Sequence, residues 1–199
     1  MPRFTLYDYA RCYLLPIPYL EKLGCKTLLS GVSIPYFFEE KGKPIVKRVT
    51  RFENDYWMYA GSYFKSCPLH IIYGKWRQKD YWNDHLIIAH TEVEAQILWY
   101  AGFQAISSPF MFDIETLYRE GIERFKCIYF YNTPDEFKTI SKSSFKDQAY
   151  YMTGITRIDD VLQWAGGSIN EFSAIIKQAM THAKRIEQLE PAPTEDKKQ

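Results

Sequence analysis

The sequence contains little of what marks secreted or membrane-spanning proteins. No run approaches the roughly eighteen apolar residues that a membrane-spanning helix needs. The N-terminal stretch MPRFTLYDYARCYLL carries charges and tyrosines where a signal peptide needs an apolar run. We therefore expect an intracellular, cytoplasmic protein that does not enter a membrane.

Cysteine and histidine are also scarce. The chain has four of each, and they form neither a C-x-x-C nor an H-x-x-x-H pair. Because such short-spaced pairs nucleate zinc sites, we expect no zinc site of local origin. The cysteines are predicted to be reduced and mostly buried thiols at Cys12, Cys25, Cys67 and Cys127.

An excess of charge of one sign is absent as well. The 199 residues include 25 Lys and Arg against 24 Asp and Glu, for a formal net charge of +1. Any nucleic-acid-binding surface must therefore be a local patch. Hydrophobic residues make up 46% and aromatic residues 17%, which indicates a folded globule of one domain with, at most, a small flanking module. Only the polar tail, residues 191–199, is expected to be disordered.

The N-terminal third predicts a helix followed by a β-hairpin. Residues 6–23 have helical character that Pro16 and Pro18 must interrupt. Two runs rich in Val, Ile, Phe and Tyr then flank a polar turn at residues 41–43. The return strand concentrates basic side chains, so it is either a charge-protected edge strand or a nucleic-acid-facing patch. The basic residues of this hairpin are Lys43, Lys47, Arg48 and Arg51.

Residues 56–82 are irregular and very aromatic, which favours short strands and loops over an amphipathic helix. Their rings either pack in the core or stack on exposed bases beside basic residues. If these rings stack on bases, Lys75 and Arg77 belong to the nucleic-acid-binding surface.

From His85 onward, apolar strands alternate with helical segments. This pattern is typical of an α/β fold with a parallel sheet covered on both faces, from about Asp84 to Gly154. Two further helices are predicted over residues 158–164 and 169–189, the second beginning near Ser168 or Asn170.

Acidic residues follow two of the predicted strands. Glu92 and Glu94 come after the first strand, and Asp135 follows the strand over 127–131. In open α/β sheets, chemistry lies beyond the carboxyl ends of strands, where these carboxylates could hold a divalent cation. The alternative is that they stabilise helix N-termini, where negative charge is favourable.

Several stretches resemble plasmid- and phage-type DNA primases. YGKWRQKDYWNDHLIIAHTEVEAQILWYAGFQAISSP is similar to their Toprim region, and KCIYFYNTPDEF to the strand that delivers the second acidic motif. LPIPYLEKLGCKT and IPYFFEEKGKPIVKRVTRF resemble the module that precedes Toprim, and DDVLQWAGGSINEFSAIIKQAMTHA the helices that follow it. The resemblance spans roughly Tyr9 to Ala183 and implies a Toprim-like sheet.

The resemblance is degenerate at the positions that carry chemistry. The catalytic glutamate of the family falls on His90 and the glycine after it on Thr91, while the next acidic position falls on Glu94. In the second motif the first acidic position falls on Asn132 or Thr133, and the last on Asp135. Imidazole is a poor ligand for magnesium, which prefers oxygen.

This pattern implies a site without its key carboxylate. Glu94 and Asp135 remain as weak magnesium candidates, and Glu92 is expected to project in a different direction from the lost glutamate. For His90 itself, a structural or hydrogen-bonding imidazole is favoured over a transition-metal site of His90, Glu94 and Asp135.

Three functional hypotheses follow. The favoured one is a catalytically degenerate Toprim protein that needs no cofactor and serves as an accessory nucleic-acid- or protein-binding subunit of a mobile-element complex. The second is a magnesium-dependent primase or nicking enzyme that uses Glu92, Glu94 and Asp135. The third is a purely protein-binding module. We divide the chain into residues 1–83, which precede Toprim, residues 84–190, which contain it, and the tail.

Overall fold

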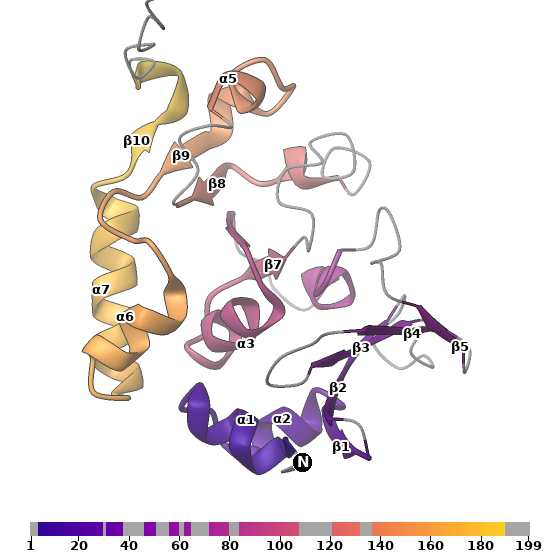
Figure 1. Ribbon diagram of the computed structural model, residues 1–199. Helices are drawn as coiled ribbons and strands as arrows, with labels where there is room; N and C mark the ends of the chain where they lie inside the picture. Colours follow the sequence, from indigo (N-terminus) through magenta and orange to yellow (C-terminus); the bar gives the residue numbers. More distant parts are fainter. Residues whose placement is uncertain are drawn as a thin grey trace, which may run out of the picture.

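The chain folds around two five-stranded sheets (Figure 1). The computed structural model describes residues 4–29, 31–37, 46–50, 56–59, 62–64, 72–79, 84–107, 121–131 and 137–189. Within these ranges, no helix combines the length and the apolar character needed to cross a bilayer.

The chain begins with two short helices, as the proline pattern predicts. Helix α1 (Leu6–Cys12) starts at a capping box in which Thr5 and Asp8 satisfy each other's backbone N–H groups. Helix α2 (Ile17–Lys22) follows with Pro16 as its N-cap, a position where the missing N–H of proline costs nothing. Gly24 then leaves the helix with a φ of 82°, which glycine adopts without strain.

The first sheet is antiparallel and contains the predicted hairpin. Its strands run in the order β1 (Lys26–Leu28), β2 (Gly31–Tyr36), β3 (Val46–Thr50), β4 (Tyr56–Tyr59) and β5 (Ser62–Phe64). In the hairpin, Tyr36 of β2 faces Val46 of β3. The reading of β3 as an edge strand is wrong, because β4 pairs with its other side. Central strands have both rows of backbone groups paired, so the basic residues of β3 do not protect an exposed edge.

The second sheet is mostly parallel and confirms the α/β class. It is built from β6 (His85–Ala89), β7 (Ala105–Ser107), β8 (Cys127–Phe130), β9 (Ala149–Tyr151) and β10 (Lys184–Arg185). The order is β10-β9-β8-β6-β7, and only β10 runs antiparallel to its neighbour. Strand β6 therefore lies between β8 and β7, so the residues that follow these strands share one edge of the sheet.

The helices that accompany the second sheet form where predicted, except at the C-terminal end of α7. Helices α3 (Glu92–Tyr100), α6 (Ile158–Trp164) and α7 (Ile169–Thr181) form where expected, and Ser168 caps α7. The extension of α7 to residue 189 is wrong, because residues 184–185 pair with β9 instead. Ile186 anchors this turn through its burial in the core. The shorter helical segments are η1 (Lys75–Lys79), η2 (Ile122–Arg124), α5 (Phe137–Ile140), η4 (Lys146–Gln148) and η5 (Ile186–Gln188).

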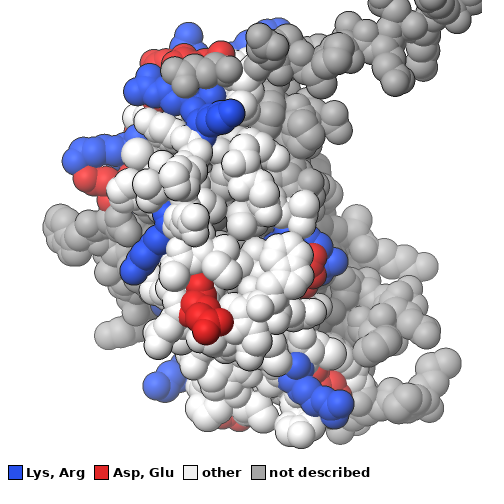
Figure 2. Space-filling model, turned by 90° about the vertical axis from the view of Figure 1, so that its left-hand side faces the viewer, with Lys and Arg blue, Asp and Glu red and all other residues white. Residues whose placement is uncertain are grey.

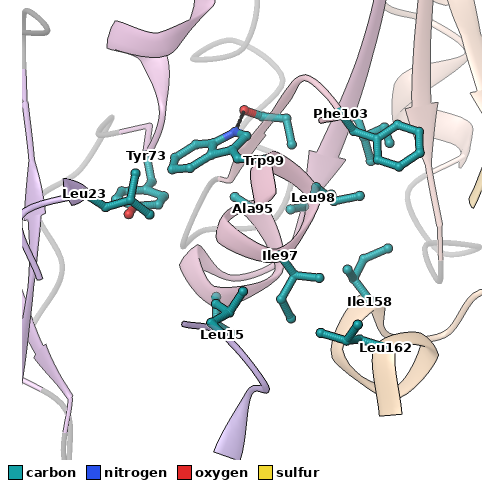
Figure 3. Packing of buried hydrophobic residues seen from close by; sticks show 14 of the residues in the cluster. Leu15, Leu23, Tyr73, Ala95, Ile97, Leu98, Trp99, Phe103, Ile158 and Leu162 are labelled. Carbon is teal, nitrogen blue, oxygen red and sulfur yellow. Dashed lines mark hydrogen bonds between the residues drawn. The ribbon is translucent and has the colours of Figure 1, made fainter. Parts of the chain in front are cut away.

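The core divides into two clusters on opposite faces of the second sheet, because alternate strand residues point to opposite faces. Ile87, Ala89 and Tyr129 belong to the larger cluster, which contains α3, and Ile88 and Phe130 to the smaller one. Residues 92–99 of α3 are all buried, and Figure 3 shows the helix between Leu15 and Leu23 on one side and Ile158 and Leu162 of α6 on the other.

Candidate functional site

The carboxyl edge of the second sheet brings His90 and Tyr131 together. His90 follows β6, Tyr131 follows β8, and their ring centroids lie 4.6 Å apart. The Nε2 atom of the His90 ring lies 2.8 Å from the backbone oxygen of Tyr131, and the backbone N–H of His90 donates to the Tyr131 hydroxyl at 3.3 Å. Because a carbonyl oxygen only accepts, Nε2 carries the proton in this contact. The imidazole thus ties the ends of two neighbouring strands together.

Glu94 holds the N-termini of two helices. One carboxylate oxygen accepts from the backbone N–H of Thr91 at 3.0 Å and from its hydroxyl at 3.1 Å, which completes the capping box of α3. The other accepts from the backbone N–H of Ile158, the first residue of α6, at 3.0 Å. Only 2% of Glu94 is exposed. A cation bound by Glu94 would have to compete with these three hydrogen bonds.

Glu92 lies on the side of α3 that faces the first sheet. It is buried, and the hydroxyl of Tyr36 in β2 donates to its Oε1 atom. Glu92 and Glu94 therefore contact different parts of the molecule. The structure does not bring these two carboxyl groups to a common point.

The described residues contain only part of the predicted magnesium site. Among them, no group of three His, Cys, Asp or Glu side chains is placed to hold a metal ion. The oxygen ligands that magnesium prefers are used in hydrogen bonds at Glu94, and the neighbouring His90 offers nitrogen. Asn132, Thr133 and Asp135, the predicted second acidic motif, lie outside the described residues.

Sequence reasoning overlooked Tyr131 and Asp159. Burial raises the pKa of the Tyr131 hydroxyl well above its ordinary value, and the negative charge of Glu94 adds to the effect. Asp159 is buried in the first turn of α6 and accepts from the Arg157 guanidinium at 2.5 and 3.0 Å. A signal for Tyr131 was present, because it directly follows a strand that the pattern predicted.

The predicted basic residues are placed in two regions. Lys47 and Arg48 occupy the middle of β3, opposite Pro35 and Ile34 of β2. On η1, Lys75 and Arg77 are half-buried, and the Arg77 guanidinium carbon lies 4.8 Å from the centre of the Trp99 ring. The remaining two predicted contacts, at positions 43 and 51, lie outside the described residues.

Comparison with known proteins finds similarity in structure only. No family model matches the sequence, and no curated protein matches it significantly. One similar solved structure is a DnaG primase catalytic domain bound to single-stranded DNA, with a TM-score of 0.53 and 15% identity over 84% of this chain. Another is the RNA polymerase domain of Mycobacterium tuberculosis primase DnaG, solved with a double-stranded DNA oligomer that has a 6-nucleotide overhang. Its TM-score is 0.54, with 11% identity over 90% of this chain.

These similarities show a primase-like fold. At such low identity they do not transfer chemistry, because one fold hosts many functions. The chain spans 60% and 64% of the length of the two primase chains.

Proposed function

We propose that this protein is a catalytically silent, primase-like scaffold that binds nucleic acid as an accessory subunit of a larger nucleoprotein complex, in the setting of a mobile element. The contacts of Glu94 and His90 carry the proposal. Both carboxylate oxygens of Glu94 hold helix N-termini, and the imidazole bridges two strand ends. Phosphoryl transfer depends on metal ions that neutralise charge, and these two residues serve the fold instead.

Two observations support nucleic acid as the ligand. The similar primase structures were solved with DNA. The first sheet carries Lys47 and Arg48 on consecutive positions of a central strand. By contrast, Figure 2 shows the face on the α6 and α7 side as mostly uncharged, with isolated residues of both signs. We therefore place the nucleic-acid contact on the first sheet.

The test is the salt dependence of binding to a fluorescently labelled single-stranded DNA, measured by anisotropy. Each phosphate contact on a single strand contributes about 0.7 to the slope of log affinity against log salt concentration. Because successive residues of a strand point to opposite faces of the sheet, the double variant Lys47→Gln/Arg48→Gln removes one phosphate contact from whichever face binds, and the slope should fall by roughly 0.7. The matched control is Lys142→Gln/Lys146→Gln, which removes the same charge from two exposed lysines elsewhere.

Three results would contradict the proposal. An equal loss in both double variants would mean that only net charge matters. Binding of a protein partner with no binding of DNA would favour the protein-binding module. Magnesium-dependent primer synthesis or strand cleavage that disappears in Asp135→Ala would favour the active enzyme.

A further inference from the structure

Helix α3 carries a second stripe of side chains besides its apolar ones. Glu92, Gln96 and Tyr100 are spaced four residues apart, so they lie along one side of the helix. The first two are buried, with 2% and 0% exposure, although their side chains are polar. Burying such groups is costly unless they are hydrogen-bonded, so the partners of this stripe determine what it does.

Every residue of the stripe contacts the N-terminal part of the chain. Tyr36 donates to Glu92, and Tyr19 packs its ring on Tyr100 with centroids 4.9 Å apart. The Tyr19 hydroxyl also donates to the backbone oxygen of Gln96 at 2.8 Å. The stripe therefore joins α3 to both α2 and β2.

The Gln96 amide is satisfied on both of its ends. Its oxygen accepts from the Tyr9 hydroxyl at 2.9 Å, and its nitrogen donates to the Tyr73 hydroxyl at 2.8 Å and to Cys25 Sγ at 3.7 Å. Burial raises the pKa of the Cys25 thiol to about 12, so this sulfur stays protonated near neutral pH. A buried network whose donors and acceptors are all paired fixes the orientation of the elements that it joins, here α3 and the segments that carry Tyr9, Cys25 and Tyr73.

Glu92 joins this network through Tyr36, whose ring packs on that of Tyr73 with centroids 5.0 Å apart. Tyr36 ends β2, all of whose residues are buried, and faces Val46 at the start of β3. The next two positions of β3 are Lys47 and Arg48. Paired strands lie about 4.8 Å apart, so a displacement of Tyr36 displaces these two residues as well.

We infer that Glu92 is a positioning residue: through Tyr36 it fixes the first sheet on α3 and so holds strand β3, which carries Lys47 and Arg48, in place for nucleic acid. The inference rests on the proposed function. It assigns Glu92 a task other than the metal binding or catalysis that the sequence offered for it.

The test compares Tyr36→Phe and Glu92→Gln with the wild-type chain. The control is Tyr129→Phe, which removes another buried hydroxyl, 3.1 Å from His85 Nδ1 in the second sheet. The first readout is amide hydrogen exchange measured on peptides from β2–β3 and from β6–β8. The second is the anisotropy titration with labelled single-stranded DNA.

In Tyr36→Phe we expect exchange in β2–β3 to accelerate roughly tenfold, since a lost buried hydrogen bond to an acidic group costs about that factor or more. Exchange in β6–β8 should stay unchanged, and DNA affinity should fall by about threefold or more. Glu92→Gln should shift both readouts in the same direction, and Tyr129→Phe should leave β2–β3 unchanged.

The two readouts separate the inference from the proposed function. Unchanged exchange in β2–β3 in both variants overturns the positioning role. Faster exchange with unchanged DNA affinity overturns its link to binding. Faster exchange in a protein whose wild type does not bind DNA sustains the mechanical role of Glu92 and refutes the proposed function.

Discussion

At the scale of single residues, the decisive feature is that acidic side chains are used as structural hydrogen-bond acceptors. Glu94 caps α3 and also receives the first N–H of α6, so one carboxylate satisfies donors of two helices. Helix N-termini leave such donors unpaired, and burial makes each unpaired donor costly. Glu94 therefore contributes to stability without any metal.

The first prediction concerns this carboxylate. Glu94→Ala should lower the free energy of unfolding by about 2 to 4 kcal/mol, because it removes a capping box and leaves a buried N–H without its acceptor. The measurement is urea unfolding in a metal-free buffer.

Glu171 provides a matched control. It occupies the same third position of α7, behind the N-cap Ser168, but it is exposed. Glu171→Ala should cost about 0.5 kcal/mol or less. Equal effects of the two substitutions would contradict the role assigned to Glu94.

At the scale of elements, the contact between η1 and α3 depends on a glycine. Gly74 has a φ of +90°, and a Cβ atom there would lie 2.3 Å from Cζ2 of Trp99. The Trp99 ring cannot easily move, because its Nε1 donates to the backbone oxygen of Ala105 at 2.8 Å (Figure 3) and Tyr73 stacks on it at 5.1 Å. The close approach of η1 to α3 thus requires the absence of a side chain.

We predict that Gly74→Ala destabilises the protein by about 3 kcal/mol or more, from backbone strain plus overpacking. The control is Gly102→Ala, at a φ of +83° with no atom within 4 Å of the added Cβ. It should cost only the strain, about 1 to 2 kcal/mol. Thermal unfolding of both variants measures the difference, and equal melting temperatures would refute the packing described for Trp99.

Sequence patterns predicted elements well where local signals agreed with the tertiary structure. Pro16, Gly24 and Ser168 mark helix ends by their own backbone chemistry, so the ends of α2 and the start of α7 followed from them. The end of α7 could not be predicted, because residues 184–185 leave the helical pattern only to pair with β9. Likewise, β3 resembled an edge strand because no local signal reveals that β4 returns beside it.

The candidate site was predictable in position but not in its contacts. The alternation of apolar strands with helices placed His90 and Glu94 after the first strand of the predicted sheet, where β6 ends and α3 begins. The bond of Glu94 to Ile158 joins residues 64 positions apart, and the contact of Glu92 with Tyr36 joins residues 56 positions apart. Such distant pairs leave no periodic signal in a single sequence.

At the scale of the whole molecule, buried tyrosines make stability depend on pH. Burial raises the pKa of Tyr9, Tyr73 and Tyr131 well above their ordinary value. In the unfolded chain these hydroxyls ionise near pH 10. Above that pH the folded state binds more protons than the unfolded state. The contribution of these tyrosines to the free energy of unfolding is therefore fully present below about pH 10 and is lost as the pH rises further.

Urea unfolding between pH 8 and pH 11 should show this decline, with a steeper fall than in a Tyr9→Phe/Tyr131→Phe variant. Tyrosinate absorbance provides the check, because the buried hydroxyls should ionise only on unfolding. Ionisation of all tyrosines near pH 10 in the native protein would contradict the burial described here.

Calorimetric titration of the purified protein with magnesium and then manganese, beside an Asp135→Ala variant, tests the claim that the carboxyl edge of the second sheet serves the fold and holds no metal. If the residues of the carboxyl edge serve the fold, neither ion gives saturable heat in the wild type, and the two proteins give the same trace. Saturable binding in the millimolar range or tighter that disappears in Asp135→Ala would contradict the claim and identify a working metal site.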